Sequence, residues 1–480
     1  MRFLPFALLA ASFALAEPLS LSQAIARARE ANPQIKKERT SVEAAESGRS
    51  EARSRFLPEV SISGSVTRID DPIYLNLNPI RTAMISVHGS EAYSSYYNQY
   101  LSQGADAATA ATYATYAQQQ TESSLEAALP SFKTKVQDEW FLNLRASVVW
   151  PIFTGGKLWA AYKAADENVD ASQAEFDAAE SAVLVEVCER YFSLKLAEEM
   201  VKLREDSMRN MEEHLERSKK LEAGGQLSYA ERLRSEVAFS EAETEMQNAE
   251  RTASLARLAL SSSLHSDTAL QATTPIAVPE VTAPLEAWKQ RATSNHPALR
   301  QIQVQKKRSK RAISAARSDY FPTLALFGYK ELWTRDLTVL EPEWAVGLSM
   351  NWVLFKGGET ASKVSNAKTA ERSLTYLEEQ ITEDLGLLVE KRYRELEYAK
   401  GRLESLGKTR ALAEESLRSQ TKAFEAGLAT SLDVVDAELS LSRLRIAELK
   451  AEYDALMAWI GLLNAAGEIS QVGTLMEVNS

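Results

Sequence analysis

The sequence has only one cysteine and four histidines, and it contains no familiar catalytic or metal-binding motif. Cys188 has no partner for an internal disulfide, and its helical surroundings predict a small, buried side chain. The histidines are far apart and share no ligand spacing, and there is no Gly-rich phosphate loop, G-x-S-x-G or H-E-x-x-H motif. These absences predict that the protein is not an enzyme and has no cofactor and no bound metal.

Long apolar runs are also missing, except at the N-terminus. There, a short positive start precedes the run FLPFALLAASFAL, which leads into A-L-A at 14–16. This pattern is typical of a secretory signal peptide, so residues 1–16 are predicted to be removed by cleavage after Ala16. The rest of the sequence contains no run of eighteen apolar residues, so no membrane helix is predicted there. An exported chain with a net charge of −11 is a poor candidate for binding nucleic acid.

The sequence is internally duplicated. N-P at 32–33 recurs as H-P at 296–297, and F-L-P at 56–58 recurs as Y-F-P at 320–322, both 264 residues later. W-P-I-F-T-G-G at 150–156 recurs as W-V-L-F-K-G-G at 352–358, at an offset of 202, and E-A-G at 222–224 recurs at 425–427, at an offset of 203. The drop in offset indicates an insertion of about sixty residues in the first copy, between Arg68 and Trp140. Each copy reads helix, strand, strand, long helix, glycine turn and returning helix.

The predicted organisation follows from this duplication. A signal peptide (1–16) precedes a first repeat (17–263), an inter-repeat linker (264–296), a second repeat (297–467) and a C-terminal tail (468–480). Strands are expected at about 59–68, 140–150, 321–330 and 343–352, long helices at about 156–221 and 359–425, and returning helices at about 228–263 and 431–466.

The four predicted strands alternate apolar and polar residues over about ten positions, the length that a tilted strand needs to cross a bilayer. Aromatic residues gather at their ends, as in an interfacial girdle. A soluble two-sided sheet alternates in the same way, but the export signal favours membrane strands. Because four strands cannot close a barrel and open edges are costly in lipid, several chains are expected to share one barrel.

The two long segments contain no proline, and each is predicted to form one helix roughly 100 Å long. A helix of that length is not the core helix of a globular enzyme. The returning segment after Gly427 keeps a heptad, whose a row is Leu432, Leu439, Ile446, Tyr453 and Ile460 and whose d row is Val435, Ser442, Leu449, Leu456 and Leu463. The other faces are polar, which predicts a hollow tube of paired helices with solvent on both walls.

In this order and in two copies, the motifs resemble the TolC-type outer-membrane efflux proteins. The resemblance runs from about Leu19 to Gly467, and it includes F-E-A-G-L-A-T-S-L-D-V-V-D at 424–436. It implies a mixed, mainly α fold, in which a homotrimer forms a 12-stranded outer-membrane β-barrel continuous with a long periplasmic α-helical barrel. The implied function is the passive exit duct of a tripartite efflux or type I secretion system of a Gram-negative-type cell. The implied partners are outer-membrane lipid, a periplasmic adaptor protein and an inner-membrane pump or ABC exporter.

The resemblance places the two glycine turns at the periplasmic tips of the tube, where the adaptor would dock. The expected docking residues are Ala223, Gly224, Gly225, Leu227, Ala426, Gly427, Leu428 and Ala429. A simple helix stop also explains the glycines, and both roles can hold together.

The resemblance also implies a periplasmic gate that contains Asp433, Asp436 and Phe424. The heptad agrees, because it puts the two aspartates at positions b and e, away from the middle of the packed seam. Three chains would bring six carboxylates toward one axis, where they would attract cations. Thr430-Ser-Leu-Asp433 also has the form of a capping box, so Asp433 has a structural explanation that Asp436 lacks.

Other gate positions depart from the family pattern. The family's gate arginine position is Ala429, its gate tyrosine is Phe424, and its acidic partner in the first copy is Ala230. A different or weaker closing network is therefore expected in this chain.

The insertion at 69–139 is rich in Tyr, Ala, Thr, Ser and Gln, with a possible helix from Ala105 to Leu129. Because it lies between two membrane strands, it is expected to protrude at the cell surface, as a tolerated loop or as a cap over the exit. The alternative to a duct is a periplasmic coiled-coil adaptor or tether without a pore. Such a protein would share the helical hairpins but would not need amphipathic strands with aromatic ends.

Overall fold

The computed structural model describes residues 17–280, 283–338 and 341–478. The predicted signal peptide and its cleavage site at Ala16 lie outside the described residues. The chain divides into two compact units. The helical unit consists of the described residues up to Arg53, Gly156–Arg317 and Lys356 onward, and the sheet unit consists of Ser54–Gly155 and Ser318–Phe355.

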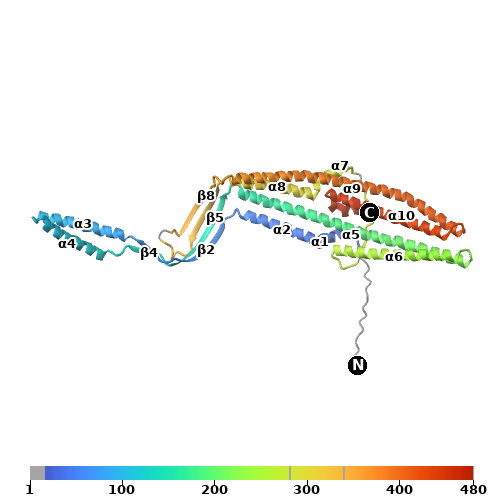
Figure 1. Ribbon diagram of the computed structural model, residues 1–480, viewed down its shortest axis with the longest axis horizontal. Helices are drawn as coiled ribbons and strands as arrows, with labels where there is room; N and C mark the ends of the chain where they lie inside the picture. The colour runs from blue at the N-terminus through green and yellow to red at the C-terminus, as the bar shows by residue number, and fades with distance from the viewer. Residues whose placement is uncertain (1–16, 281–282, 339–340, 479–480) are drawn as a thin grey trace, which may run out of the picture. The chain divides into compact units, whose positions relative to one another are not determined.

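The helical unit contains one set of four helices twice. The first set is α1 (Leu21–Ala31), α2 (Pro33–Ser54), α5 (Lys157–Ala223) and α6 (Tyr229–Ser263), and the second is α7 (Leu285–Asn295), α8 (Pro297–Ser318), α9 (Glu359–Glu425) and α10 (Ser431–Ala465). Corresponding helices have equal lengths of 11, 22, 67 and 35 residues. Helix α6 returns along α5, and α10 returns along α9 (Figure 1). Helix α7 lies in the stretch that was predicted only as a linker.

The main hydrophobic core of the helical unit surrounds the middle of α5. Tyr191 and Phe192 are fully buried there, and the Tyr191 hydroxyl donates a hydrogen bond to the Leu19 carbonyl at 2.7 Å. Leu19 ends β1 (Glu17–Leu19), which pairs in parallel with β6 (Leu270–Ala272). The short C-terminal elements η1 (Ile469–Gln471) and α11 (Val472–Val478) also contribute to this core. Each large apolar side chain that is fully buried contributes about 1.5–3 kcal/mol to folding.

Helix α10 packs on α5 as well as on α9. Val435 and Leu456 of the predicted d row are buried, whereas Leu432, the first residue of the a row, is 47% exposed. Val434 and Ala437 are buried instead. The buried surface of α10 is therefore wider than the two-helix seam that the heptad predicted, and near the turn it leaves out Leu432.

The sheet unit is built on a four-stranded antiparallel sheet in the order β2-β5-β7-β8. The strands are β2 (Glu59–Arg68), β5 (Trp140–Phe153), β7 (Thr323–Glu331) and β8 (Trp344–Asn351). Val60 lies opposite Val148 and Leu326 opposite Leu348, so apolar residues of neighbouring strands share one face. Among the described residues, β2 and β8 each have one edge that pairs with no strand.

The apolar face of this sheet is open. Val60, Ile62, Val346, Leu348 and Met350 are between 63% and 74% exposed. Soluble proteins rarely expose so many large apolar side chains together, so this face requires an apolar environment or a partner.

The opposite face of the sheet is polar. The Ser61 and Ser147 hydroxyls lie 2.9 Å apart on adjacent strands. Arg145 forms an ion pair with the buried Glu331, and its guanidinium lies 4.2 Å from the centre of the Tyr329 ring. The two faces thus differ in polarity around Ser61, Ser147 and Arg145, although Phe327 also lies on the second face, over Gly347.

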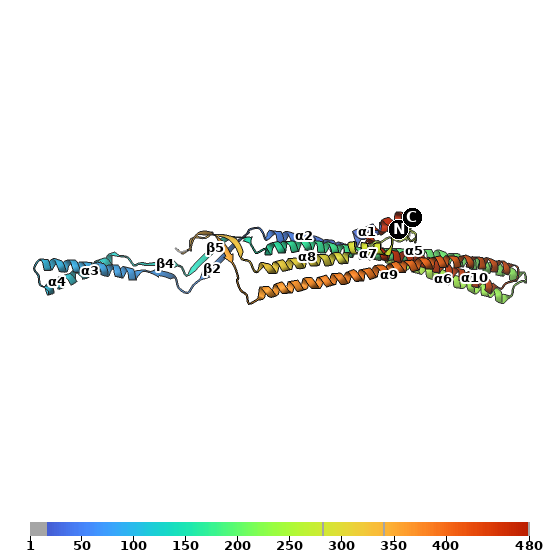
Figure 2. The same ribbon diagram turned by 90° about the horizontal axis from the view of Figure 1, so that it is seen from above.

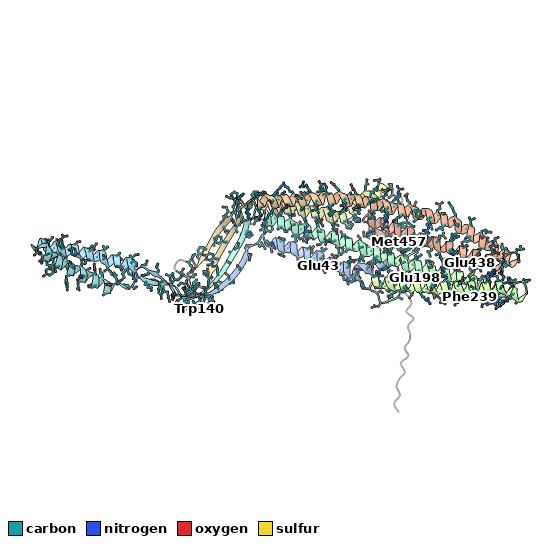
Figure 3. The ribbon with its side chains drawn as sticks, in the orientation of Figure 1. Glu43, Trp140, Glu198, Phe239, Glu438 and Met457 are labelled. Atoms are coloured by element: carbon teal, nitrogen blue, oxygen red, sulfur yellow. The ribbon has the colours of Figure 1, made fainter. Side chains whose placement is uncertain are left out.

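Tryptophans lie at both ends of the strands, and two of them repeat one contact. The Trp150 indole N–H donates to the Phe56 carbonyl at 2.9 Å, and the Trp352 indole N–H donates to the Tyr320 carbonyl at 3.1 Å. Trp140, labelled in Figure 3, begins β5 at the other end. The duplication therefore extends to a matched side-chain hydrogen bond.

The insertion forms a short ribbon and a helical hairpin. Strand β3 (Ile73–Asn76) pairs antiparallel with β4 (Lys133–Gln137). Helices α3 (Asn78–Ser102) and α4 (Ala107–Ala128) lie side by side (Figure 2). The predicted helix from Ala105 to Leu129 corresponds to α4, whereas α3 was not predicted, because serines and tyrosines interrupt its apolar period.

Candidate functional site

The turns that follow α5 and α9 have the same backbone structure. Gly225 and Gly427 both have φ of 72°, a conformation that favours glycine. The N–H of Gln226 bonds the Leu221 carbonyl at 2.8 Å, and the N–H of Leu428 bonds the Ala423 carbonyl at 2.7 Å. The structural equivalent of Gly427 is therefore Gly225. The E-A-G match, which paired Gly427 with Gly224, is wrong by one residue.

The residues predicted to dock an adaptor surround these turns. Leu428 is 83% exposed, while Leu227 and Ala429 are partly buried. The other predicted docking residues are exposed, namely Ala223, Gly224, Gly225, Ala426 and Gly427. The turns therefore present a surface of small residues with one large apolar side chain.

Asp433 caps the start of α10. The Thr430 hydroxyl accepts from the Asp433 N–H at 3.3 Å, and the Asp433 carboxylate accepts from the Thr430 N–H at 2.8 Å and from its hydroxyl at 2.7 Å. These hydrogen bonds to the Thr430 side chain and backbone lower the pKa of Asp433. The predicted capping box is present.

Asp436 has no such structural role. Its side chain is exposed, and within the described part of the chain its carboxylate makes no hydrogen bond and no ion pair. The equivalent residues of the first copy are Glu231 and Arg234, which form an ion pair at 3.0 Å. The pair of adjacent acids is thus a property of the second copy alone.

Four buried polar side chains join the two helical hairpins just behind the turns. His214 Nε2 and the Ser431 hydroxyl lie 2.9 Å apart, the Ser431 and Ser235 hydroxyls 2.9 Å, and the Ser235 and Ser218 hydroxyls 2.8 Å. His214 is 3% exposed and the three serines are 0% exposed. Because Ser218 and His214 lie on α5, Ser235 on α6 and Ser431 on α10, this hairpin junction links the first copy to the second.

Phe424 covers the hairpin junction. Its side chain is 3% exposed, and its ring centre lies 5.0 Å from that of His214. The next residue, Glu425, forms an ion pair with Arg217 at 3.2 Å. In the single chain, Phe424 is therefore packed away from the exposed aspartates, against a histidine to which sequence reasoning assigned no role.

About two turns beyond Ser431 on α10, a buried carboxylate adds to the contact between α5 and α10. Glu438 is 3% exposed, and it accepts a hydrogen bond from the Asn210 amide at 3.0 Å. Burial raises the pKa of Glu438. Figure 3 labels Glu438 on α10 and Phe239 on α6, near the ends that carry the turns.

Burial also controls the charge of His214. Burial, together with the smaller effect of the nearby Arg217, lowers the pKa of His214 to about 4, so the ring is neutral at pH 7. A neutral imidazole has one acceptor nitrogen, which can receive the Ser431 hydroxyl. Two charged groups from other helices lie at the hairpin junction: Glu231 accepts the Ser431 N–H at 3.2 Å, and Glu425 forms the ion pair with Arg217.

No catalytic or metal centre accompanies the hairpin junction. Across residues 17–280, 283–338 and 341–478, no three His, Cys, Asp or Glu side chains are grouped so that they could hold a metal ion. In the same stretches, no helix has the length and apolarity needed to span a membrane. Cys188 is buried, and burial raises the pKa of its thiol to about 12.

Comparison with known proteins gives one consistent result. The sequence profile of the outer membrane efflux protein family matches residues 24–265 and 288–468. The chain is 27% identical over 333 residues to the cobalt-zinc-cadmium resistance protein CzcC of Cupriavidus metallidurans, covering 66% of this chain and 76% of CzcC. It is 22% identical over 318 residues to the alkaline protease secretion protein AprF of Pseudomonas aeruginosa, covering 62% of this chain and 64% of AprF. The match thus spans less than two thirds of the length of AprF.

The fold agrees with the sequence comparison. The solved structure of CusC superimposes with a TM-score of 0.71 over 93% of this chain and 92% of CusC, at 16% sequence identity. At that identity the likeness concerns the fold.

The chain belongs to the outer membrane efflux protein family. As the sequence predicted, it is a mainly helical outer-membrane protein of a channel family and not an enzyme.

Proposed function

We propose that this chain forms the outer-membrane exit duct of a tripartite efflux or type I secretion system. The observation that carries the proposal is the four-stranded sheet, which has an open apolar face, a more polar opposite face and two edges that no strand of the described residues pairs with. In lipid, unpaired edges cost several kcal/mol for each unsatisfied backbone group, so the sheet must close on copies of itself. Three chains supply twelve strands, with apolar residues toward lipid and Ser61, Arg145 and Ser147 toward the lumen.

In this proposal, the paired long helices continue the barrel as a periplasmic tube. Each chain contributes the hairpins α5/α6 and α9/α10, which are 67 residues long in one arm and 35 in the other. The 67-residue helices are roughly 100 Å long, which suits a tube that reaches across the periplasm. The gate of the tube would lie at the end that carries the two turns, where the tube is narrow when closed and widens when it opens.

Asp433 and Asp436 would line this end as a double ring of six carboxylates, and the hairpin junction would keep the ring closed. Both aspartates are exposed in the single chain, which leaves them available to face a pore. The hairpin junction ties α10 to α5 and α6 through Ser431, so the α9/α10 hairpin cannot swing outward without breaking it. Phe424 would take part in closure by covering His214, in place of the absent gate arginine and tyrosine.

A periplasmic adaptor protein would dock on the exposed turns, and an inner-membrane pump or ABC exporter would drive transport through it. Leu428, at 83% exposure, is the largest apolar group available for that contact. The relatives are named for cobalt-zinc-cadmium resistance and for alkaline protease secretion. A passive, water-filled duct can serve both kinds of cargo. The family match favours this function over a periplasmic adaptor or tether without a pore.

Conductance in planar lipid bilayers tests the proposed duct. Protein extracted with detergent from outer membranes should insert and give steps of ion conductance. A protein that is soluble without detergent and gives no conductance would refute the proposal.

A further inference from the structure

The helical hairpin of the insertion carries an apolar stripe that no element in the described part of the chain covers. Ile80, Met84 and Val87 follow the i, i+4, i+7 spacing of one helix face, and they are 54%, 42% and 55% exposed. The face of α3 that meets α4 is different and contains Ile85 and Gly89, both of which are buried. The stripe therefore points away from α4 and faces solvent in the single chain.

The hairpin has a weak interface of its own. Helix α4 buries only the small side chains of Ala110, Ala114 and Ala117 against α3. Gly89 is close to Glu122, whose side chain occupies the space that a β-carbon at Gly89 would need. On α3, Ile85 is buried in this contact, but Ile80, Met84 and Val87 lie outside it. Two helices that bury so little apolar area are marginal without a further partner.

The charges of the hairpin do not oppose contact between copies. Residues 77–129 contain one basic residue, Arg81, and its guanidinium donates to the Leu129 carbonyl at 2.9 and 3.1 Å at the end of α4. Of the four acidic residues, Asp106 caps α4 and Glu122 accepts a hydrogen bond from Gln118. The stripe itself contains no charged residue until Glu91, one turn beyond Val87.

The connection to the sheet brings neighbouring hairpins together. The Ile69 N–H bonds the Glu139 carbonyl at 2.9 Å, and Arg68 forms an ion pair with Glu139 at 2.6 Å, so the ribbon below the hairpin continues the β2–β5 ladder. Strand β2 is also an edge strand, with no partner on its outer side among the residues that the structure describes. When β2 pairs with β8 of the next chain, the hairpin of each chain rises at a junction between two copies.

The dimensions also fit. A barrel of twelve tilted strands is roughly 24 Å across between backbones, given strands about 4.8 Å apart. Six helices packed side by side about 10 Å apart form a ring roughly 20 Å across. Three hairpins therefore match the rim of the barrel from which they rise.

We propose that the three α3/α4 hairpins of the trimer pack into a six-helix collar at the exit of the duct, with the Ile80, Met84 and Val87 stripe of each chain against α4 of the next. The contact between Gly89 and Glu122 fixes which residues of α4 lie at the same height as the stripe on α3. In the collar, Ser123 and Ala127 on α4 of the neighbouring chain would therefore face the stripe. Both residues are small and exposed. The collar rests on the proposed trimer and adds to it an interface outside the membrane.

Heat dissociation of the trimer, followed on denaturing gels, tests the collar. The double variant Met84→Glu and Val87→Glu would bury six carboxylates in the collar, so its trimer should dissociate at a temperature lower by roughly 5 °C or more. The control, Ser86→Glu, adds a charge on the same helix outside the stripe and should leave that temperature unchanged. Equal dissociation temperatures for the stripe and control variants would overturn the collar.

A cysteine pair gives an independent result. Val87→Cys with Ser123→Cys should give disulfide-linked dimers and trimers under oxidising conditions, because within one chain the two positions face away from each other and cannot reach disulfide distance. The pair Ser86→Cys with Ser123→Cys should give none, and buried Cys188 does not interfere. Intact trimers without cross-links would refute the collar but not the trimer, and they would indicate that a lipid or another protein covers the stripe. Protein that never forms trimers would refute the proposed duct.

Discussion

Acidification should loosen the hairpin junction through His214. The pKa of His214 is lowered from 6.5 to about 4, because burial and Arg217 disfavour the charged ring. In the unfolded or locally opened chain, the histidine takes up its proton near its ordinary pKa. The stabilisation from the neutral ring is therefore fully present above pH 6.5, falls as the pH drops from 6.5 to 4, and falls no further below that.

The size of the effect follows from the same values. A shift of this size corresponds to roughly 3 kcal/mol of lost stability at pH 4, or roughly a hundredfold rise in the opened population. Other groups near the turns respond differently. Because the pKa of Asp433 is lowered, its stabilising effect is lost only when the pH falls below the ordinary titration range of an aspartate. Because the pKa of Glu438 is raised, its protonation favours the folded state as the pH falls.

Hydrogen exchange measures this opening locally. Backbone amides at 229–236 and 431–438 should exchange progressively faster in the wild type, relative to intrinsic rates, as the pH falls from 6.5 to 4. His214→Gln should remove this dependence, because the glutamine amide can reach Ser431 but does not titrate. His214→Phe should exchange faster at every pH, since it leaves a buried hydroxyl without its partner at a cost of about 1–3 kcal/mol.

The reasoning fails if His214→Gln keeps the pH dependence of the wild type in this window, since another group would then be responsible. His88→Gln is the matched control, because His88 is exposed on α3 in the other unit and its loss should change nothing at the hairpin junction. If acid also raises the conductance of the wild type but not that of His214→Gln, the hairpin junction controls the gate.

Further predictions concern the turn of the second copy. Asp433→Ala with Asp436→Ala should reduce cation selectivity and block by multivalent cations in bilayers while the trimer still assembles; unchanged selectivity would exclude the carboxylates from the pore. Thr430→Ala should lower the free energy of unfolding by about 1 kcal/mol through loss of the cap, measured by denaturant titration, and Thr430→Ser should restore it. Gly427→Ala should cost about 1–2 kcal/mol because of its positive φ, whereas Gly386→Ala, inside α9 with open space around it, should stabilise the helix. Equal effects at the two glycines would contradict the assigned turn geometry.

Periodic and local patterns predicted much of this fold. The alternation in residues 59–68 corresponds to β2 with the same bounds, and the S/T-x-x-D form of Thr430–Asp433 corresponds to the observed capping box. Both depend on neighbours in sequence, so both can be read without knowledge of the tertiary structure.

The hairpin junction could not be predicted in this way. It joins His214 to Ser431 across 217 residues, and a lone serine in a polar helix carries no signal of burial. Its members meet only because α5 and α10 pack in one particular register, which the heptad of α10 alone does not specify. The sequence offered one hint, the loss of the family's usual gate residues at Ala429 and Phe424, which predicted a different or weaker closing network without naming its members.

The mass of the native particle tests the central claim most directly. Native mass spectrometry of protein extracted from outer membranes in a mild detergent should give the mass of three chains, because only three four-stranded sheets close a twelve-stranded barrel. A particle of one chain would leave sheet edges open in lipid, and a particle of two chains would close a barrel of eight strands instead of twelve. Either mass would contradict the proposed duct.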